Sequence, residues 1–370
     1  MPLRTLHPEK EKELRVRLQG PLTQKERVNC EAKLNMYKVY TAPTDIGEEQ
    51  SLALRGQMLS PKHFELLLDK TGIVERPDFE PLCILLKGHL PKDLLDRVRP
   101  ILRSVARQSV ASGNRVDAAG AGRGLRRRRD GSTSKITGVP RLEDMADEHY
   151  VRLKVAKDGT VGYNAQTVRG GQKLPCRLTS WTQTANPVEW QLMSELSEAV
   201  GKAFRHSWVN QEWERQSRKA SKTLREFVIK TRKGITPFTT ITVNKSWPTA
   251  AHIDSGDLKQ GFGVMCCLGE FEGCDLVFPR YKVAVRYREG DILLADVANQ
   301  VHGNTHLLNP DGSVPKLDEE PERLVCVFYY QEKMEQCLSP EEEMGIINSW
   351  VRCKSTRSKK STTTTKKKKK

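Results

Sequence analysis

The chain has 370 residues, with 62 Lys and Arg against 46 Asp and Glu, and a formal net charge of +16. No apolar run approaches the roughly 18 residues that a membrane helix needs, and the first residues lack the apolar stretch of a secretory signal peptide. Nine cysteines, an odd number without a C-x-x-C pair, argue against a secreted disulfide scaffold and a zinc finger. We therefore expect a reduced intracellular protein.

The first third of the chain is predicted to support a core that follows it. Residues 1–60 are charged and weakly periodic and form an N-terminal extension. Residues 61–112 are expected to be a helical support, because apolar residues between 94 and 105 recur at three- and four-residue spacing. Pro100 lies inside this run and should kink or interrupt the helix.

The positive charge is concentrated in two segments that cannot bury a core. Gly113–Lys135 contributes +5 and the last 17 residues contribute +9, which leaves only +2 for the remaining 330 residues. We expect a basic flexible loop at 113–138 and a basic disordered tail at 353–370. Basic runs gain salt-sensitive affinity for nucleic-acid phosphates. The loop residues proposed to contact a DNA backbone are Arg126, Arg127, Arg128 and Arg129. The lysine tail is read either as a nuclear import signal or as a DNA contact.

Residues 139–352 are predicted to form the folded core. Residues 149–155 alternate like a strand, and Asn186-Pro187 with Glu189 has the pattern of a helix start, which predicts a long helix over 187–218. From 235 to 332 short β-branched runs alternate with Gly, Pro and Asp, as in an antiparallel sandwich. The expected fold class is α+β, a double-stranded β-helix (jelly roll) with a helical N-terminal half packed against it. The six predicted strands are 238–243, 263–268, 275–278, 283–287, 291–294 and 324–330.

Three side chains have the pattern of a metal site. His252 and Asp254 are two residues apart, so in an extended segment both point to the same side, and His302 follows a later strand. Two histidines and one carboxylate form the facial triad that leaves open positions on Fe(II). His306 is an alternative distal ligand, but His302 is preferred because Gly-Asn-Thr follows it and can turn the chain back toward the site.

Arg323 opens the last predicted strand, 21 residues after His302. A guanidinium there can hold a carboxylate in bidentate fashion, as the distal end of 2-oxoglutarate requires. The plainer alternative is an ion pair with the nearby Glu320 or Glu322. The order of the four groups on a predicted jelly roll favours a site for Fe(II), 2-oxoglutarate and O₂.

Seven ordered pieces between about 240 and 330 resemble the TET/JBP family of Fe(II)/2-oxoglutarate-dependent nucleic-acid base dioxygenases. The chain is similar to the fungal and kinetoplastid type, without the animal cysteine-rich and CXXC regions. The matching pieces are T-V-N (242–244), T-A-A-H-I-D-S-G-D (249–257), G-F-G (261–263), L-V-F-P-R-Y-K-V-A-V (276–285), G-D-I-L-L (290–294), H-G-N-T (302–305) and R-L-V-C-V-F-Y-Y (323–330).

The resemblance implies roles for individual residues. His252, Asp254 and His302 would hold the iron, and Arg323 would hold 2-oxoglutarate. Asp257 would contact the flipped base, although an Asp after Ser-Gly is also a common turn residue. The further residues that the resemblance implies are Asn244 for the co-substrate or substrate, Gln331 where part of the family has a base-reading His, and Asn114 and Arg115 near the base and the DNA backbone.

The expected activity is oxidation of a methylated base in double-stranded DNA by a nuclear, monomeric enzyme. The base must be flipped out of the duplex to reach a buried metal. An acid such as Asp257 can accept a hydrogen bond from an exocyclic amine, which favours 5-methylcytosine, oxidised to 5-hydroxymethylcytosine and further. N6-methyladenine demethylation and thymine hydroxylation stay open. Three further alternatives also stay open. They are a protein or small-molecule hydroxylase on the same fold, a catalytically inactive DNA-binding protein, and a zinc module of Cys266, Cys267 and Cys274.

Overall fold

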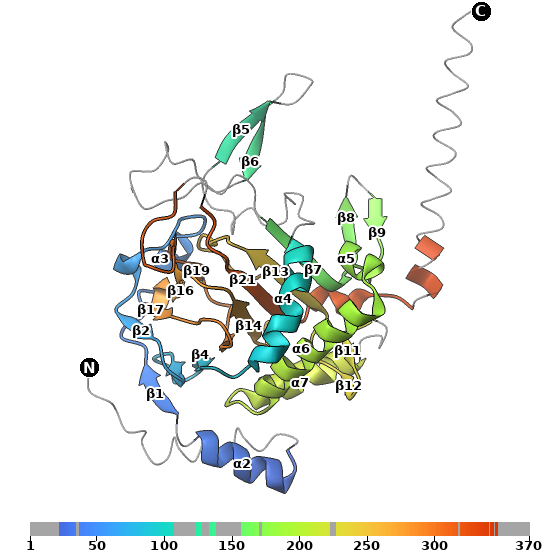
Figure 1. Ribbon diagram of the computed structural model, residues 1–370, viewed down its shortest axis with the longest axis horizontal. Helices are drawn as coiled ribbons and strands as arrows, with labels where there is room; N and C mark the ends of the chain where they lie inside the picture. Colours follow the sequence, from blue (N-terminus) through green and yellow to red (C-terminus); the bar gives the residue numbers. More distant parts are fainter. Residues whose placement is uncertain are drawn as a thin grey trace, which may run out of the picture.

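The fold is seen in a computed structural model (Figure 1), which describes residues 22–34, 37–106, 123–127, 133–137, 157–169, 172–222, 227–316, 319–339, 341–343 and 345–346. None of the helices in these ranges combines the length and the apolar character needed to cross a bilayer. The expected strand at 149–155 and the expected tail at 353–370 lie outside the described residues.

Two facing sheets form a jelly-roll core, as predicted. The main sheet has nine strands in the order β1-β3-β4-β18-β14-β21-β13-β7-β10, and the smaller sheet has four in the order β19-β16-β17-β2. Helices α4 and α6 pack on the outer face of the main sheet, while the smaller sheet covers its inner face (Figure 1). The site is built where segments from the two sheets meet.

All six predicted strands of the core are present. They are β13 (Thr240–Lys245), β14 (Gly263–Leu268), β16 (Leu276–Phe278), β17 (Val283–Val285), β18 (Ile292–Ala295) and β21 (Leu324–Tyr329). Along β14, Cys266 faces the helices and Cys267 faces the smaller sheet, as alternation in a strand requires. Both faces of β14 are buried, which explains its unbroken apolar sequence.

The N-terminal region corrects the prediction of a purely helical support. Residues 61–112 contain η1 (Pro61–His63) and three strands, β2 (Leu66–Leu68), β3 (Gly72–Glu75) and β4 (Pro81–Leu86), before helix α4 (Lys92–Ala106). Strand β4 pairs with β18, and β2 pairs with β17, so this region completes both sheets. The apolar run of β4 lacks alternation because all six of its residues are buried. Helix α4 continues through Pro100 and buries the predicted apolar face.

The long helix predicted over 187–218 is two helices, α6 (Pro187–Arg205) and α7 (Asn210–Lys222). The predicted start is confirmed, because the Asn186 side chain accepts hydrogen bonds from the amides of residues 188 and 189 while Glu189 reaches back to the Asn186 amide. The break follows from Ser207. Its hydroxyl donates to the Phe204 carbonyl at 2.7 Å and accepts from the Val209 amide at 3.3 Å, which replaces helical hydrogen bonds.

The segment predicted to be a loop at 113–138 contains a hairpin of β5 (Arg123–Arg127) and β6 (Thr133–Thr137). Glycines in the sequence suggested a loop, but the ladder of five residue pairs gives each of the two strands a local partner.

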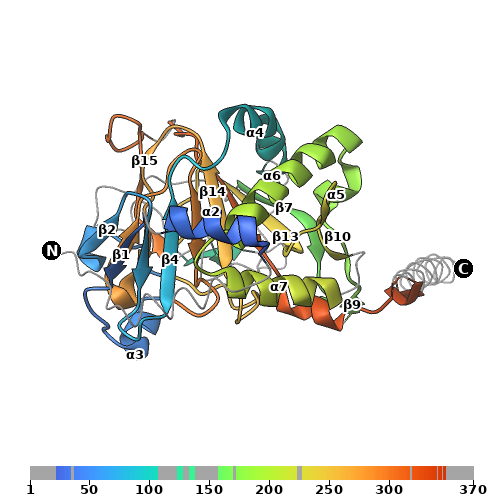
Figure 2. The ribbon, with the colours of Figure 1, turned by 90° about the horizontal axis from the view of Figure 1, so that it is seen from below.

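The N-terminal extension holds α2 (Gln24–Leu34), β1 (Lys38–Thr41) and α3 (Glu48–Leu52). In Figure 2, α2 crosses the molecule near α6, and Glu26 pairs with Arg205 at 3.3 Å.

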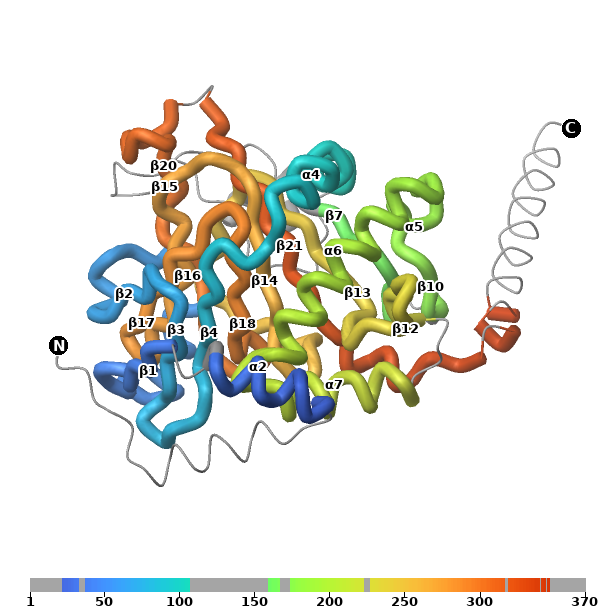
Figure 3. The backbone as a smooth tube through the Cα atoms, turned by 60° about the horizontal axis from the view of Figure 1, so that its bottom comes forward, coloured from blue at the N-terminus to red at the C-terminus, as the bar shows by residue number. Residues whose placement is uncertain are grey.

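The remaining elements extend the two sheets or lie around them (Figure 3). They are β7 (Lys157–Asn164), β8 (Thr167–Arg169), β9 (Gln172–Leu174), β10 (Arg177–Leu178), α5 (Ser180–Thr184), β11 (Lys230–Thr231), β12 (Gly234–Ile235), β15 (Glu272–Gly273), η5 (Pro279–Tyr281), β19 (Gly303–Asn304), β20 (Leu307–Leu308) and η6 (Glu332–Gln336). Cys176 and Cys337 form a disulfide, which corrects the expectation that every cysteine is reduced.

Candidate metal centre and its surroundings

The predicted metal ligands come together because their two chain segments pair. His252 and His302 form an antiparallel bridge, in which each backbone amide donates to the other residue's carbonyl, at 2.8 and 2.9 Å. Residues directly opposite in such a pair place their side chains on the same face. The two imidazole ring centres accordingly lie 4.3 Å apart.

Backbone carbonyls orient both imidazoles. Nδ1 of His252 is 2.7 Å from the Ala250 carbonyl, and Nδ1 of His302 is 3.0 Å from the Gln300 carbonyl. A carbonyl oxygen only accepts, so each Nδ1 carries the proton of its ring. The lone pair of each Nε2 is then free to bind a metal, which is the usual arrangement of histidine ligands.

Asp254 completes the group. Its two carboxylate oxygens lie 3.5 Å from Nε2 of His252 and 3.6 Å from Nε2 of His302. One ligand atom from each residue lies within 4.8 Å of the other two, as a shared metal ion requires. Burial would raise the pKa of the Asp254 carboxyl, but when the two imidazoles also carry a proton on Nε2, their hydrogen bonds and charge hold it well below its usual range. The side chain remains about 32% exposed, so the site is open to one side.

The residues that follow His302 fix its position. A Cβ on Gly303 would lie 2.8 Å from the backbone nitrogen of Ala251, so only glycine permits the two segments to approach this closely. Asn304 is buried, and its side-chain oxygen accepts from the amide and hydroxyl of Thr249 at 3.1 and 2.8 Å. Asn304 thereby ties the segment before His252 to the segment after His302. The positioning role of Asn304 was not predicted, although H-G-N-T was recognised as a motif.

Arg323 lies in a pocket of aromatic rings rather than in an ion pair. Its side chain is 2% exposed, and its guanidinium carbon lies 5.5 Å from the ring centre of Phe271 and 5.7 Å from that of Tyr287. Nη2 donates to the Tyr287 hydroxyl at 2.9 Å, whereas Nε has no hydrogen-bond partner. Across the described residues, no carboxylate lies within ion-pair distance of this guanidinium, so it is not the partner of Glu320 or Glu322. A buried, unneutralised guanidinium fits an anionic ligand.

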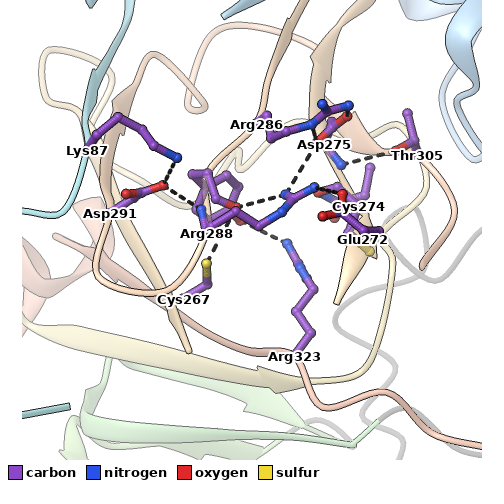
Figure 4. Close-up of polar contacts among 12 residues, drawn as sticks. Lys87, Cys267, Glu272, Cys274, Asp275, Arg286, Arg288, Asp291, Thr305 and Arg323 are labelled. Carbon is purple, nitrogen blue, oxygen red and sulfur yellow. Dashed lines mark hydrogen bonds and ion pairs between the residues drawn. The ribbon is translucent and has the colours of Figure 1, made fainter. Parts of the chain in front are cut away.

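The neighbouring cations are already paired (Figure 4). Arg288 bonds Glu272 at 2.9 Å and Asp275 at 3.4 Å, and Arg286 bonds Asp275 at 3.0 Å. Asp291 accepts from the Arg288 amide at 2.6 Å and from Lys87 at 2.5 Å. This network fixes the segment after β17 that carries Tyr287, and it pairs the acids around Arg323 with other cations.

The residues predicted to contact substrate are partly assembled. Asp257, which follows Asp254 by three residues, is buried. It forms an isolated antiparallel bridge with Gln331. The Gln331 side-chain oxygen accepts from the Ala165 amide at 3.0 Å. Asn244 lies on β13, opposite Val325 of β21, and Val325 follows Arg323 by two residues in the chain.

Other predicted residues lie elsewhere or outside the described ranges. Strand β5 contains Arg126 and Arg127, whose side chains are not among the described parts of the structure. Four other predicted residues lie outside the described residues, namely Asn114, Arg115, Arg128 and Arg129. His306 is not a member of the metal-ligand group found among the described residues. The same holds for Cys266, Cys267 and Cys274, of which the first two face opposite sides of β14.

Comparison with known proteins agrees with this geometry. The family model Tet_JBP, described as the oxygenase domain of the 2OGFeDO superfamily, matches residues 161–332. Residues 161–332 are a TET/JBP oxygenase domain. The domain contains all three candidate metal ligands and Arg323. This domain match implies Fe(II), 2-oxoglutarate and O₂, and the His-Asp-His group with the unneutralised guanidinium fits them.

Relatives that are similar to part of this chain include two groups of kinetoplastid enzymes. The chain is 48% identical over 77 residues to the bifunctional helicase and thymine dioxygenase JBP2 of Leishmania infantum, covering 20% of the chain and 7% of JBP2. It is 30% identical over 160 residues to the thymine dioxygenase JBP1 of Trypanosoma brucei brucei, covering 43% of the chain and 17% of JBP1. The match thus spans less than a fifth of either relative.

The solved structure of NgTET1 in complex with 5mC DNA has a similar fold. It superposes with a TM-score of 0.50 at 10% sequence identity, covering 91% of this chain and 98% of that one. At this identity the similarity establishes the fold alone. The jelly-roll prediction is therefore confirmed by both the sheets and the structural comparison.

Proposed function

We propose that the protein is an Fe(II)/2-oxoglutarate-dependent dioxygenase that oxidises a methyl group at C5 of a pyrimidine base in DNA. The observation that carries the proposal is the convergence of His252, Asp254 and His302, with the buried guanidinium of Arg323 left without a carboxylate. When bound, iron with 2-oxoglutarate and O₂ supplies the oxidation, in which CH₃ becomes CH₂OH and 2-oxoglutarate becomes succinate and CO₂.

The chain's own residues hold the reactants in place. The two imidazoles present Nε2 because Ala250 and Gln300 hold their Nδ1 protons, and Asp254 stays ionised beside them. Arg323 would bind the distal carboxylate of 2-oxoglutarate. Asn244 would contact the co-substrate or the substrate from β13. Asp257 and Gln331 would meet the base, which must leave the duplex to reach the site.

The preferred substrate is 5-methylcytosine, with oxidation to 5-hydroxymethylcytosine and further. Its support is Asp257, whose carboxylate can accept from the exocyclic amine of cytosine. Thymine is the second candidate, supported by the names of the JBP1 and JBP2 relatives, which are thymine dioxygenases. Both bases carry a methyl group at C5, so a site that presents this methyl to a metal serves either. We further propose double-stranded DNA as the partner, action as a monomer and a nuclear location.

The test is product formation on defined duplexes. The full chain is reconstituted with Fe(II) in the absence of oxygen. It is then given O₂ and a duplex that bears 5-methylcytosine, thymine or N6-methyladenine, with and without 2-oxoglutarate. Nucleoside mass spectrometry should show hydroxymethyl product that depends on 2-oxoglutarate. His302→Ala should lower turnover at least about 100-fold, because loss of a supporting residue alone costs 10–100-fold in metal sites.

His306→Ala is the matched control, because it removes an imidazole four residues away that is outside the ligand group. It should retain turnover. Product from thymine duplexes alone would select the second candidate, and equal activity in His302→Ala and wild type would contradict the proposal.

A further inference from the structure

The hydrogen bond between Arg323 and Tyr287 leaves two donors without acceptors in the same buried place. Tyr287 is 2% exposed, and its hydroxyl oxygen accepts from Nη2 of Arg323 at 2.9 Å. Because that oxygen is the acceptor, the phenolic proton points away from the guanidinium. No described residue accepts this proton, and none accepts from Nε of Arg323. Buried donors normally have partners, so this pair indicates a missing ligand.

The surroundings determine the charge of that ligand. The acids Asp275 and Glu272 are bonded to Arg286 and Arg288, and neither is in ion-pair contact with Arg323 (Figure 4). Burial raises the pKa of the Tyr287 phenol, although the Arg323 charge lowers it, so the phenol is protonated and donates at neutral pH. Two donors, one of them cationic, with no described acid in ion-pair contact with the guanidinium, select a carboxylate.

The ring of Tyr287 is held rigidly, as a binding residue requires. The carbonyl of Tyr287 accepts from the Arg288 guanidinium at 3.1 Å and from the Cys267 thiol at 3.6 Å. Phe271 lies under both cations, with the guanidinium carbons of Arg288 and Arg323 at 4.9 and 5.5 Å from its ring centre. The ion pairs around Arg288 therefore fix the position of the phenol relative to Arg323.

We propose that Tyr287 is a second binding residue for the distal carboxylate of the 2-oxo acid, its phenol donating to one oxygen while Arg323 donates to the other. The inference rests on the proposed function. It makes Tyr287 a determinant of selectivity for 2-oxo dicarboxylates over 2-oxo monocarboxylates, because a ligand without the distal carboxylate leaves both donors unpaired.

The test measures binding rather than turnover. The full chain is loaded with Mn(II), and 2-oxoglutarate and pyruvate are titrated into it by isothermal calorimetry. Pyruvate has the same 2-oxo acid end but no distal carboxylate. Tyr287→Phe, which removes one oxygen, should bind 2-oxoglutarate about ten- to a hundredfold more weakly than wild type, the loss expected for a hydrogen bond to a charged group. Its pyruvate affinity should be unchanged.

Tyr281→Phe is the matched control, since it removes a phenol from another buried tyrosine whose ring stacks on Arg280 rather than on Arg323. It should bind both acids as wild type does. Equal 2-oxoglutarate affinity in Tyr287→Phe and wild type would overturn the role of Tyr287 while leaving the proposed function intact. Parallel losses for 2-oxoglutarate and pyruvate would also overturn it, because they indicate general distortion. A wild-type protein that fails to bind 2-oxoglutarate would contradict the proposed function itself.

A second measurement needs no variant and so does not depend on the folding of Tyr287→Phe. In 2-oxoglutaramate an NH₂ group replaces one distal oxygen, so only one of the two donors finds an acceptor. Wild-type protein with Mn(II) should bind this amide at least about tenfold more weakly than 2-oxoglutarate. Equal binding of the amide and the acid would overturn the two-donor arrangement.

Discussion

Single residues decide how closely the metal-binding segments approach. The imidazoles of His252 and His302 are 4.3 Å apart between ring centres because their backbones pair directly. That pairing depends on Gly303, where a Cβ would lie 2.8 Å from the Ala251 nitrogen and 2.9 Å from the Ala250 carbonyl carbon. These neighbours are backbone atoms, which cannot rotate away, so any side chain at Gly303 must separate the segments.

We therefore predict that Gly303→Ala weakens metal binding. The added methyl group should cost about 1–3 kcal/mol of unfolding free energy, as overpacking does, and should lower Mn(II) affinity at least about tenfold by moving His302. Mn(II) titration followed by electron paramagnetic resonance, together with urea unfolding, measures both effects. Gly256→Ala is the control, because a Cβ there meets nothing within 4 Å. Unchanged Mn(II) affinity in Gly303→Ala would refute the close-approach argument.

At the scale of elements, helix α4 is attached to the core by charge as well as by its apolar face. Arg99 bonds Glu289 at 2.8 Å, and Arg103 bonds Glu322 at 2.6 Å. Glu289 also accepts from the Gly269 amide at 2.7 Å. Glu322 directly precedes Arg323, and Glu289 lies two residues after Tyr287. The helix thus braces the two segments that carry the proposed carboxylate site, one after β17 and one before β21.

This attachment predicts a dependence of stability on pH. The hydrogen bond from Arg103 lowers the pKa of Glu322, although its partial burial raises it. A carboxyl with a lowered folded pKa stabilises the fold above its unfolded pKa, about 4.3, and the stabilisation is lost as pH falls through the folded value. Glu322→Gln should therefore lose about 1 kcal/mol of unfolding free energy at pH 7, and the difference from wild type should shrink below pH 4.

Urea unfolding of both proteins between pH 7 and pH 3 measures this difference. Glu49→Gln, which changes an exposed carboxylate on α3 far from the network in sequence, is the control and should track wild type. A Glu322→Gln deficit that stays constant down to pH 3 would show that lost packing, rather than ionisation, is responsible.

The sequence predicted the elements whose signals are local and missed those that depend on distant contacts. Strand β14 and the capped start of α6 follow from β-branched runs and from Asn186 with Glu189. Strand β4 was missed because a fully buried run has no period of its own, and only pairing with β18 makes it a strand. The role proposed for Tyr287 had no sequence signal, since its contact with Arg323 joins two segments that are 36 residues apart in the chain.

At the scale of the whole molecule, the oxygenase domain is completed by chain that precedes it. The matched region begins at residue 161, yet β4 pairs with β18 and β2 pairs with β17. Without these strands β18 would be an edge of the main sheet, and its apolar residues would be exposed. The segment before His252 is also held from outside the domain, because the Ala251 amide donates to the Gln57 carbonyl at 2.8 Å. The metal site therefore depends on the N-terminal region for its rigidity.

The end of the described chain is joined to the core by the disulfide between Cys176 and Cys337, which are separated by 161 residues in sequence. A cross-link over so long a loop restricts the unfolded chain, and typical disulfides contribute about 2–4 kcal/mol. Buried Glu343 holds the same segments together, because it accepts from the Cys176 amide at 3.0 Å and from the Leu338 amide at 2.8 Å. Loss of the cross-link should thus lower stability without unfolding this region.

We predict that the double variant Cys176→Ser with Cys337→Ser unfolds at lower urea concentration than oxidised wild type, by about 2–4 kcal/mol in unfolding free energy. Dithiothreitol should lower the wild-type midpoint toward that of the variant and leave the variant unchanged, because the other described cysteines are free thiols. Mn(II) and 2-oxoglutarate affinity should persist in the reduced protein, since neither cysteine belongs to the His-Asp-His group. A wild-type midpoint that does not respond to dithiothreitol would show that the cross-link contributes nothing beyond what the Glu343 hydrogen bonds already supply.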